Sequence, residues 1–97
     1  MRKTLYVYVL TNLSGTLHIG MTSNLGRRME AHREGYVPGF TSKYRLNRLI
    51  YYEVCEGGEV ATTRDWQLKK WNRARKIRLI EAANPSWRDL TYEVLTG

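Results

Sequence analysis

The sequence predicts a small α+β domain, and two observations carry this prediction. Residues 6–10 are rich in β-branched and aromatic residues, residues 17–21 alternate with Leu17, Ile19 and Met21 on one face, and turn-forming residues separate the two segments, which predicts a β-hairpin. The rest of the chain gives, in order, a helical segment, a third strand-like segment and two further helical segments. We therefore expect the order β-β-α-β-α-α in a single domain that spans residues 1–97.

The register of the hairpin decides which side chains share a face of the sheet. If the connection covers residues 11–15, Tyr8 lies directly opposite His18 on the same face. A slip of one residue would place the two side chains on opposite faces, because side chains alternate along a strand. The sequence leaves this choice open.

The first helix is expected over residues 25–34. Residues 22–24 read Thr-Ser-Asn, which are residues that cap helix N-termini, and Gly35 supplies a left-handed conformation that ends the helix. Arg28 and His32 are one turn apart, so they share a stripe of this helix.

The second half of the chain is expected to hold one strand and two helices. We predict a loop over residues 36–47, a strand over 49–54, a long helix over 59–71 and a shorter one over 75–83. Asn84 precedes a proline, which ends the shorter helix, and residues 87–90 are expected to fold back on the domain.

Asp65 interrupts the apolar face of the long helix. It follows Ala61 and precedes Leu68 at helical spacing, so its carboxylate lies on or beside the buried stripe. A buried carboxylate without a partner is costly. Two interpretations have equal weight here: a salt bridge to Lys69, one turn later, or a metal ligand.

The charge of the chain favours a polyanionic partner. Sixteen Lys and Arg against nine Asp and Glu give a formal charge of +7. The basic residues that could contact phosphates are Arg27, Lys69, Lys70, Arg73, Arg75 and Lys76, although a solvated helix face would read the same way. Trp71, within this stretch, could stack on a base or pack.

Other features limit the class of protein. The single cysteine, Cys55, excludes an internal disulfide and is expected to be a small packing residue. The apolar runs are too short to cross a membrane, so a cytoplasmic location is expected by default. The sequence does not indicate an oligomeric state.

Several short motifs together resemble the GIY-YIG nuclease superfamily. They are Tyr6-Val7-Tyr8, His18-Ile19-Gly20, Arg28 and His32, the segments 20–28 and 67–71, and residues 84–90. The chain is most similar to small stand-alone bacterial members of the UvrC-type, URI-like kind (UPF0213-like). The resemblance implies a three-stranded antiparallel sheet flanked by helices. It also implies hydrolysis of phosphodiester bonds in DNA, single-stranded or branched, with one Mg²⁺ or Mn²⁺ ion.

The resemblance also implies roles for individual residues. Tyr8 matches the tyrosine that helps to activate the attacking water, and Arg28 matches the arginine that stabilises the phosphate. His32 matches a histidine that holds the water or a tyrosine. Asp65 matches the metal ligand. Two residues match supporting positions of the family, Asn84 and Gly20.

Two positions depart from the family pattern. His18 stands where the second motif has tyrosine, and Asp65 stands where the metal ligand is glutamate. His18 could take over proton abstraction, because a free imidazole has a pKa of about 6.5, or it could simply fill the space of the tyrosine. Aspartate is one methylene shorter, and a shift of about 1 Å can cost on the order of a hundredfold in rate. A metal-dependent nuclease and a catalytically weak nucleic-acid-binding module therefore both remain open, as does a protein-interaction domain.

Overall fold

The computed structural model describes residues 3–33 and 45–96 of the chain, and it confirms the predicted α+β fold. The elements are β1 (Thr4–Thr11), β2 (Leu17–Thr22), α1 (Leu25–Arg33), β3 (Arg48–Glu56), α3 (Gly58–Lys70), α4 (Arg73–Ala83) and α5 (Thr91–Thr96). The short helix α5 follows the six predicted elements. Gly35 and most of the predicted loop lie outside the described residues.

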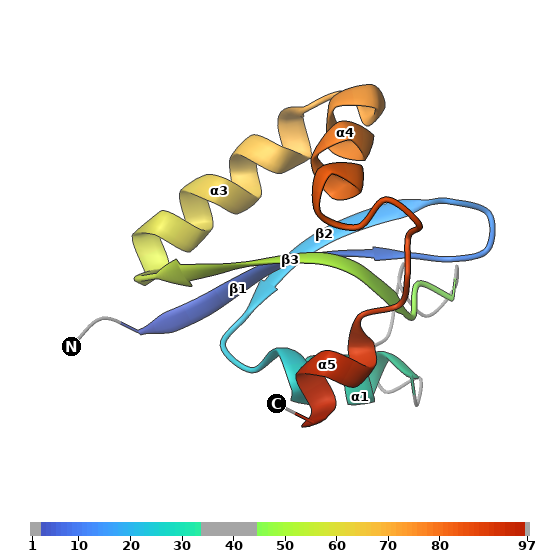
Figure 1. Cartoon of the computed structure of the whole chain (residues 1–97). Coiled ribbons are helices and arrows are strands. Elements are labelled where there is room, and N and C mark those ends of the chain that lie inside the picture. Colours follow the sequence, from blue (N-terminus) through green and yellow to red (C-terminus); the bar gives the residue numbers. More distant parts are fainter. Residues whose placement is uncertain (1–2, 34–44, 97) are drawn as a thin grey trace.

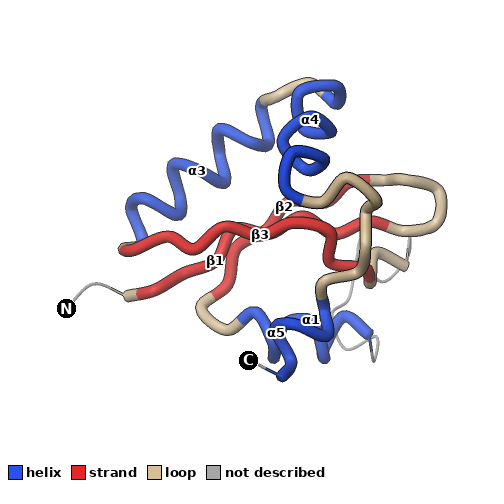
Figure 2. Tube along the Cα trace, viewed as in Figure 1, coloured by secondary structure: helices blue, strands red, loops and turns tan. Residues whose placement is uncertain are grey.

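The three strands form one antiparallel sheet in the order β2-β1-β3. Helices α3 and α4 cover one face of this sheet, and α1 and α5 cover the other (Figures 1 and 2). The central strand β1 is buried on both faces. Val7 and Val9 belong to the core under α3 and α4, while Tyr8 and Leu10 belong to the core under α1.

The hairpin register differs by two residues from the one that would place Tyr8 directly opposite His18. Tyr8 pairs with Gly20, and His18 pairs with Leu10, so Tyr8 and His18 are not directly opposite each other. The connection covers residues 12–16, because the Asn12 side chain accepts hydrogen bonds from the backbone N–H of Ser14 (3.0 Å) and of Thr16 (3.1 Å). A shift of two residues preserves the face, so Tyr8 and His18 still share one side of the sheet.

Helix α1 begins where the capping residues predicted. The Asn24 side chain accepts a hydrogen bond from the backbone N–H of Arg27 at 3.0 Å, which satisfies one of the free donors at the helix start. Leu25 and Met29 are buried against the sheet. Because α1 is held on this side, Arg28 and His32 project from it next to the strand that carries Tyr8.

The segment after α4 folds back along the outer side of β3, as predicted. The backbone of Leu49 donates to Asp89 (3.2 Å) and accepts from Leu90 (2.7 Å). Asp89 also accepts from the N–H and hydroxyl of Thr91 at 3.0 and 2.6 Å, and so caps α5. The sequence did not predict α5, because a six-residue helix depends on tertiary packing, and Thr91 is only 1% exposed.

Candidate active site

Tyr8 and Gly20 form the floor of the candidate site. Tyr8 is 3% exposed in the middle of β1. A Cβ atom added at Gly20 would lie 2.7 Å from the phenol oxygen of Tyr8 and 2.8 Å from its Cζ. The phenol can therefore lie across β2, the strand at the edge of the sheet, only because residue 20 has no side chain.

Helix α1 contributes Arg28 and His32. The rings of Tyr8 and His32 meet edge to face, with centroids 6.4 Å apart and an interplanar angle of 68°. The positive charge of Arg28 acts on both rings. It lowers the pKa of Tyr8, against the larger raising effect of burial, and it adds to the effect of burial in lowering the pKa of His32. The helical spacing predicted from the sequence thus brings both α1 side chains to the tyrosine.

His18 joins the cluster from β2. Its imidazole is half-buried, and burial lowers its pKa below the usual 6.5. The charge of Lys69 lowers this pKa further, and the charge of Asp65 opposes the shift. His18 also contributes to lowering the pKa of His32. The two imidazoles are therefore electrostatic neighbours.

Asp65 reaches the cluster from the opposite side of the sheet. Helix α3 packs on the other face, but it contacts the edge strand β2. The Asp65 carboxylate raises the pKa of Tyr8 and opposes the lowering at His18, so it lies near both. The five predicted groups, one phenol, two imidazoles, one guanidinium and one carboxylate, are thus linked by their charge interactions and by the Tyr8–His32 ring contact.

Only one of the two carboxylate oxygens of Asp65 has a protein partner in the described part of the chain. Its Oδ2 lies 3.0 Å from Nζ of Lys69, so the predicted salt bridge is present. Its Oδ1 is buried and has no hydrogen-bond partner in the described part of the chain, and the same is true of Nε2 of His32. A buried acceptor without a partner is costly, so Oδ1 is available to a water molecule, a ligand or an ion.

The donor set fits one hard divalent cation. Residues 3–33 and 45–96 contain no group of three His, Cys, Asp or Glu side chains that could form a protein cage for a metal. Mg²⁺ and Mn²⁺ do not need such a cage, because one carboxylate with water and substrate oxygens is a common arrangement. The unpartnered Oδ1 of Asp65 is the atom that could hold the ion.

The pKa directions separate possible acids from possible bases. Burial raises the pKa of Tyr8 above 10, and this outweighs the lowering by Arg28, so the phenol is protonated at neutral pH. Burial lowers the pKa of His32 to about 4. Both imidazoles are therefore neutral near pH 7 and can accept a proton, whereas Tyr8 can donate a hydrogen bond.

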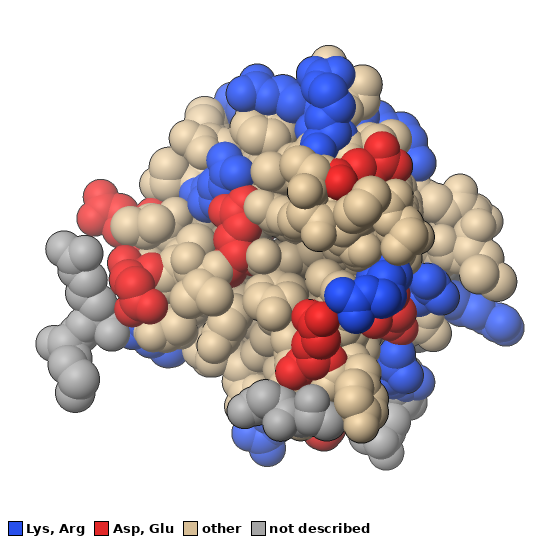
Figure 3. All heavy atoms as spheres, viewed as in Figure 1, with Lys and Arg blue, Asp and Glu red and all other residues tan. Residues whose placement is uncertain are grey.

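The predicted phosphate-binding residues are divided between the two sides of the sheet. Arg27 lies exposed on α1, and the others lie on α3 and α4. Figure 3 shows Lys and Arg side chains gathered over α4 and the end of α3. One of them has a structural contact, because Arg73 donates to the backbone oxygen of Gly15 at 2.8 Å and ties α4 to the hairpin turn.

The tryptophans on α3 and after it differ in their exposure. Trp71 is half-buried against the core, with the guanidinium of Arg75 3.8 Å and that of Arg64 5.2 Å from its ring centre. Trp66 is 57% exposed. The sequence could have indicated this exposure, because the positions one turn before and after Trp66 on the helix are polar, Thr62 and Lys70.

Asn84 supports the sheet rather than contacting the cluster. Its amide donates to the backbone oxygens of Ile50 (2.9 Å) and Arg88 (2.8 Å) and accepts from the N–H of Arg88 (3.0 Å). Ile50 is the extra residue where the β1–β3 register shifts. Asn84 therefore satisfies a carbonyl that the irregular ladder leaves open.

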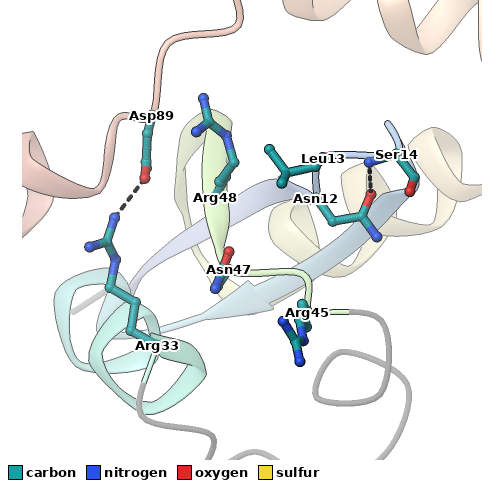
Figure 4. Close-up of a pocket in the computed structure, with 8 residues that line it drawn as sticks. All are labelled: Asn12, Leu13, Ser14, Arg33, Arg45, Asn47, Arg48 and Asp89. Atoms are coloured by element: carbon teal, nitrogen blue, oxygen red, sulfur yellow. Dashed lines mark hydrogen bonds and ion pairs between the residues drawn. The ribbon is translucent and has the colours of Figure 1, made fainter.

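A hollow of about 630 Å³ lies at the far end of the hairpin (Figure 4). Its lining residues are Asn12, Leu13, Ser14, Arg33, Arg45, Asn47, Arg48 and Asp89. The sequence did not predict this hollow, since its walls come from four separate segments. Arg33 is paired with Asp89 at 2.6 Å, and none of the five clustered groups lines it. A smaller hollow of about 360 Å³ is lined by Arg28 and Arg27.

Comparison with known proteins agrees with this fold and geometry. Residues 4–78 match the GIY-YIG catalytic domain, and the chain belongs to this family. Its relatives are UPF0213 proteins. The chain is 33% identical over 88 residues to UPF0213 protein CPE1444 of Clostridium perfringens, covering 91% of this chain and 92% of that protein. It is 30% identical over 76 residues to a UPF0213 protein of Staphylococcus aureus, covering 78% and 93%.

A solved structure shows the same fold. The solution structure of the UPF0213 protein BH0048 from Bacillus halodurans aligns with a TM-score of 0.59 at 24% identity. The alignment covers 91% of this chain and 94% of that chain. In the described part of the chain, no helix is long and apolar enough to cross a membrane.

Proposed function

We propose that this chain is a metal-dependent DNA endonuclease that hydrolyses phosphodiester bonds in single-stranded or branched DNA. One observation carries the proposal: Tyr8, His18, Arg28, His32 and Asp65 converge at the β2 edge from four different elements. Membership in the GIY-YIG family supports the nuclease class. The basic side chains on α3 and α4 support a polyanionic substrate.

Arg28 binds the phosphate that is cleaved. Its guanidinium carries a fixed positive charge and a planar set of donors, which suits a phosphate that gains negative charge as water attacks. Its place beside the hollow at the start of α1 leaves room for a strand to approach.

His18 accepts the proton of the attacking water. The water oxygen forms the new bond to phosphorus, the bond to the leaving oxygen breaks, and the water proton passes to the imidazole. Tyr8 and His32 orient this water, since the phenol donates and the neutral imidazole accepts a hydrogen bond. Because burial lowers the pKa of His18, activity should decline at a pH below the 6.5 that a free histidine would give.

Asp65 holds a Mg²⁺ or Mn²⁺ ion through its unpartnered Oδ1. Such an ion, when bound, supplies positive charge that stabilises the leaving oxygen. The shorter aspartate side chain is compatible with this role because α3 lies directly against β2, the strand that carries His18.

The test is a nuclease assay on single-stranded, branched and duplex DNA with Mg²⁺, with Mn²⁺ and with a chelator. We expect chelator-sensitive nicking that Arg28→Ala and Asp65→Ala each reduce by at least about a hundredfold. Glu59→Ala is the matched control, because Glu59 is an exposed carboxylate in the first turn of the same helix. Absence of cutting by the folded wild-type protein under all these conditions would refute the proposal.

The alternative is a nucleic-acid-binding module without turnover, and the Asp65–Lys69 pair favours it. With Lys69 3.0 Å away, the carboxylate already has a cationic partner. This function predicts salt-sensitive DNA binding and no bound metal. Calorimetric titration with Mn²⁺ separates the two, since heat of binding that disappears in Asp65→Asn supports the nuclease and its absence supports the binding module.

A further inference from the structure

Trp66 is a large aromatic side chain left on the surface. It is 57% exposed, although it lies on a helix whose other face packs in the core. A tryptophan in this position gains little of the stabilisation that burial of its ring would give to the fold. More than half of the Trp66 surface is therefore open to solvent.

Lys70 lies over one face of the Trp66 ring. Its Nζ is 3.9 Å from the ring centre, in a cation–π contact one helical turn after the tryptophan. The ammonium occupies part of one face of the indole. The contact also holds a positive charge beside the ring, where a phosphate of a bound strand could pair with it.

The Trp66–Lys70 pair runs parallel to the Asp65–Lys69 pair. Both pairs have the same one-turn spacing, and each residue of one is adjacent in sequence to a residue of the other. Because consecutive helical residues point about 100° apart, the exposed ring lies on the stripe of α3 beside the one that carries Asp65. Trp71 offers no such surface, since two guanidiniums flank its ring and the core covers part of it.

We propose that Trp66 is a stacking platform for an unpaired nucleobase of the DNA strand held at the Asp65 cluster. The inference rests on the proposed function in taking DNA as the ligand, and it adds the residue that selects unpaired strands. A tryptophan face binds any base by stacking, whereas the bases of an intact duplex are stacked on one another and cannot reach it. Lys70 would contact the adjacent phosphate.

The test measures binding without turnover, in a chelator at low salt. Trp66→Ala should weaken binding of a single-stranded oligonucleotide on the order of ten- to a hundredfold, which corresponds to the loss of one stacked base. Trp66→Phe should keep most of the affinity. Binding of a duplex, and of an abasic strand with the same phosphates, should change less than about twofold in Trp66→Ala.

Tyr92→Ala is the matched control, because Tyr92 is an exposed aromatic residue on α5, on the other side of the sheet. It should leave binding of the single strand unchanged. Equal weakening of the normal and abasic strands in Trp66→Ala would overturn the inference, and so would unchanged affinity for the normal strand. A change in sedimentation of the free protein on Trp66→Ala would assign the ring to self-association and also overturn it.

The outcome is separate from that of the proposed function. If the wild type cuts DNA but Trp66→Ala binds the single strand as well as the wild type does, the stacking role fails and the nuclease stands. If the wild type never cuts but Trp66 is needed for binding unpaired bases, the stacking role stands on a binding module.

Discussion

Gly20→Ala tests whether the close approach of Tyr8 to β2 shapes the candidate site. The added Cβ would lie 2.7 Å from the phenol oxygen and 2.8 Å from Cζ of Tyr8. Ordinary contact needs ~3.4 Å or more, so the two groups must separate by about 0.7 Å. The ring cannot move away freely, because Leu25 and Met29, both 3% exposed or less, pack in the same core.

Two effects of this substitution follow from the geometry. Overpacking of this kind costs about 1–3 kcal/mol of the free energy of unfolding. A displacement of the phenol by several tenths of an ångström should also reduce cleavage on the order of ten- to a hundredfold, since catalytic geometry is sensitive at that scale. Both effects should appear together, because the same contact causes them.

Urea denaturation and the nuclease assay measure the two effects. Gly58→Ala is the matched control, because the nearest atom to a Cβ there is Cδ1 of Leu5 at 3.8 Å, an ordinary contact at the start of α3. That variant should be neutral or more stable by up to about 1 kcal/mol. If Gly20→Ala unfolds at the same urea concentration as the wild type, with an unchanged slope, the steric argument is wrong.

Two further predictions concern stability. Burial lowers the pKa of His32 to about 4, whereas a histidine in the unfolded chain takes up a proton near pH 6.5. The contribution of His32 to the free energy of unfolding should therefore be fully present above pH 6.5 and be lost as the pH drops from 6.5 to 4. Between pH 7 and pH 4.5 the His32→Asn variant should lose ~1–2 kcal/mol less of its free energy of unfolding than the wild type, after allowance for solvent screening. Urea titrations at the two pH values measure this difference, and equal losses in the variant and the wild type would contradict the prediction. Asn84→Ala should cost about 2–4 kcal/mol, because it leaves backbone groups of Ile50 and Arg88 without partners. Thermal unfolding should show a larger loss than for Asn72→Ala, which removes an exposed helix cap worth about 1 kcal/mol, and an equal loss would argue against the buried role.

The elements that the sequence predicted correctly are those with local signals. Asn24 caps α1 through its own side chain, and α4 begins after Asn72, which accepts from the N–H of Arg75 at 2.9 Å. Helix α4 begins at Arg73, two residues before the predicted start at residue 75, because Asn72 caps it between the two predicted helices. Cys55, expected as a packing residue, is buried in the core under α3.

The sequence was a poor guide where the outcome depends on contacts that no local pattern reveals. The hairpin register followed the reach of the Asn12 side chain to Thr16, which no strand pattern reveals. The paired and unpaired oxygens of Asp65 show that the two interpretations of this residue were not exclusive, because a carboxylate has two acceptor atoms and Lys69 occupies one. The exposure of Trp66 depends on which turn of α3 faces the sheet.

The sequence by itself determined the order of the first six elements, the faces of β1 and α1, and the family to which the chain belongs, because periodicity, capping and motif spacing are properties of neighbouring residues. Only the tertiary structure decided that Asp65, on a helix across the sheet, meets Tyr8 and His18 at the β2 edge. The physical reason is that burial and charge act through space. The shifts that lower the pKa of the two imidazoles and raise the pKa of the phenol exist only after the sheet has brought these groups together.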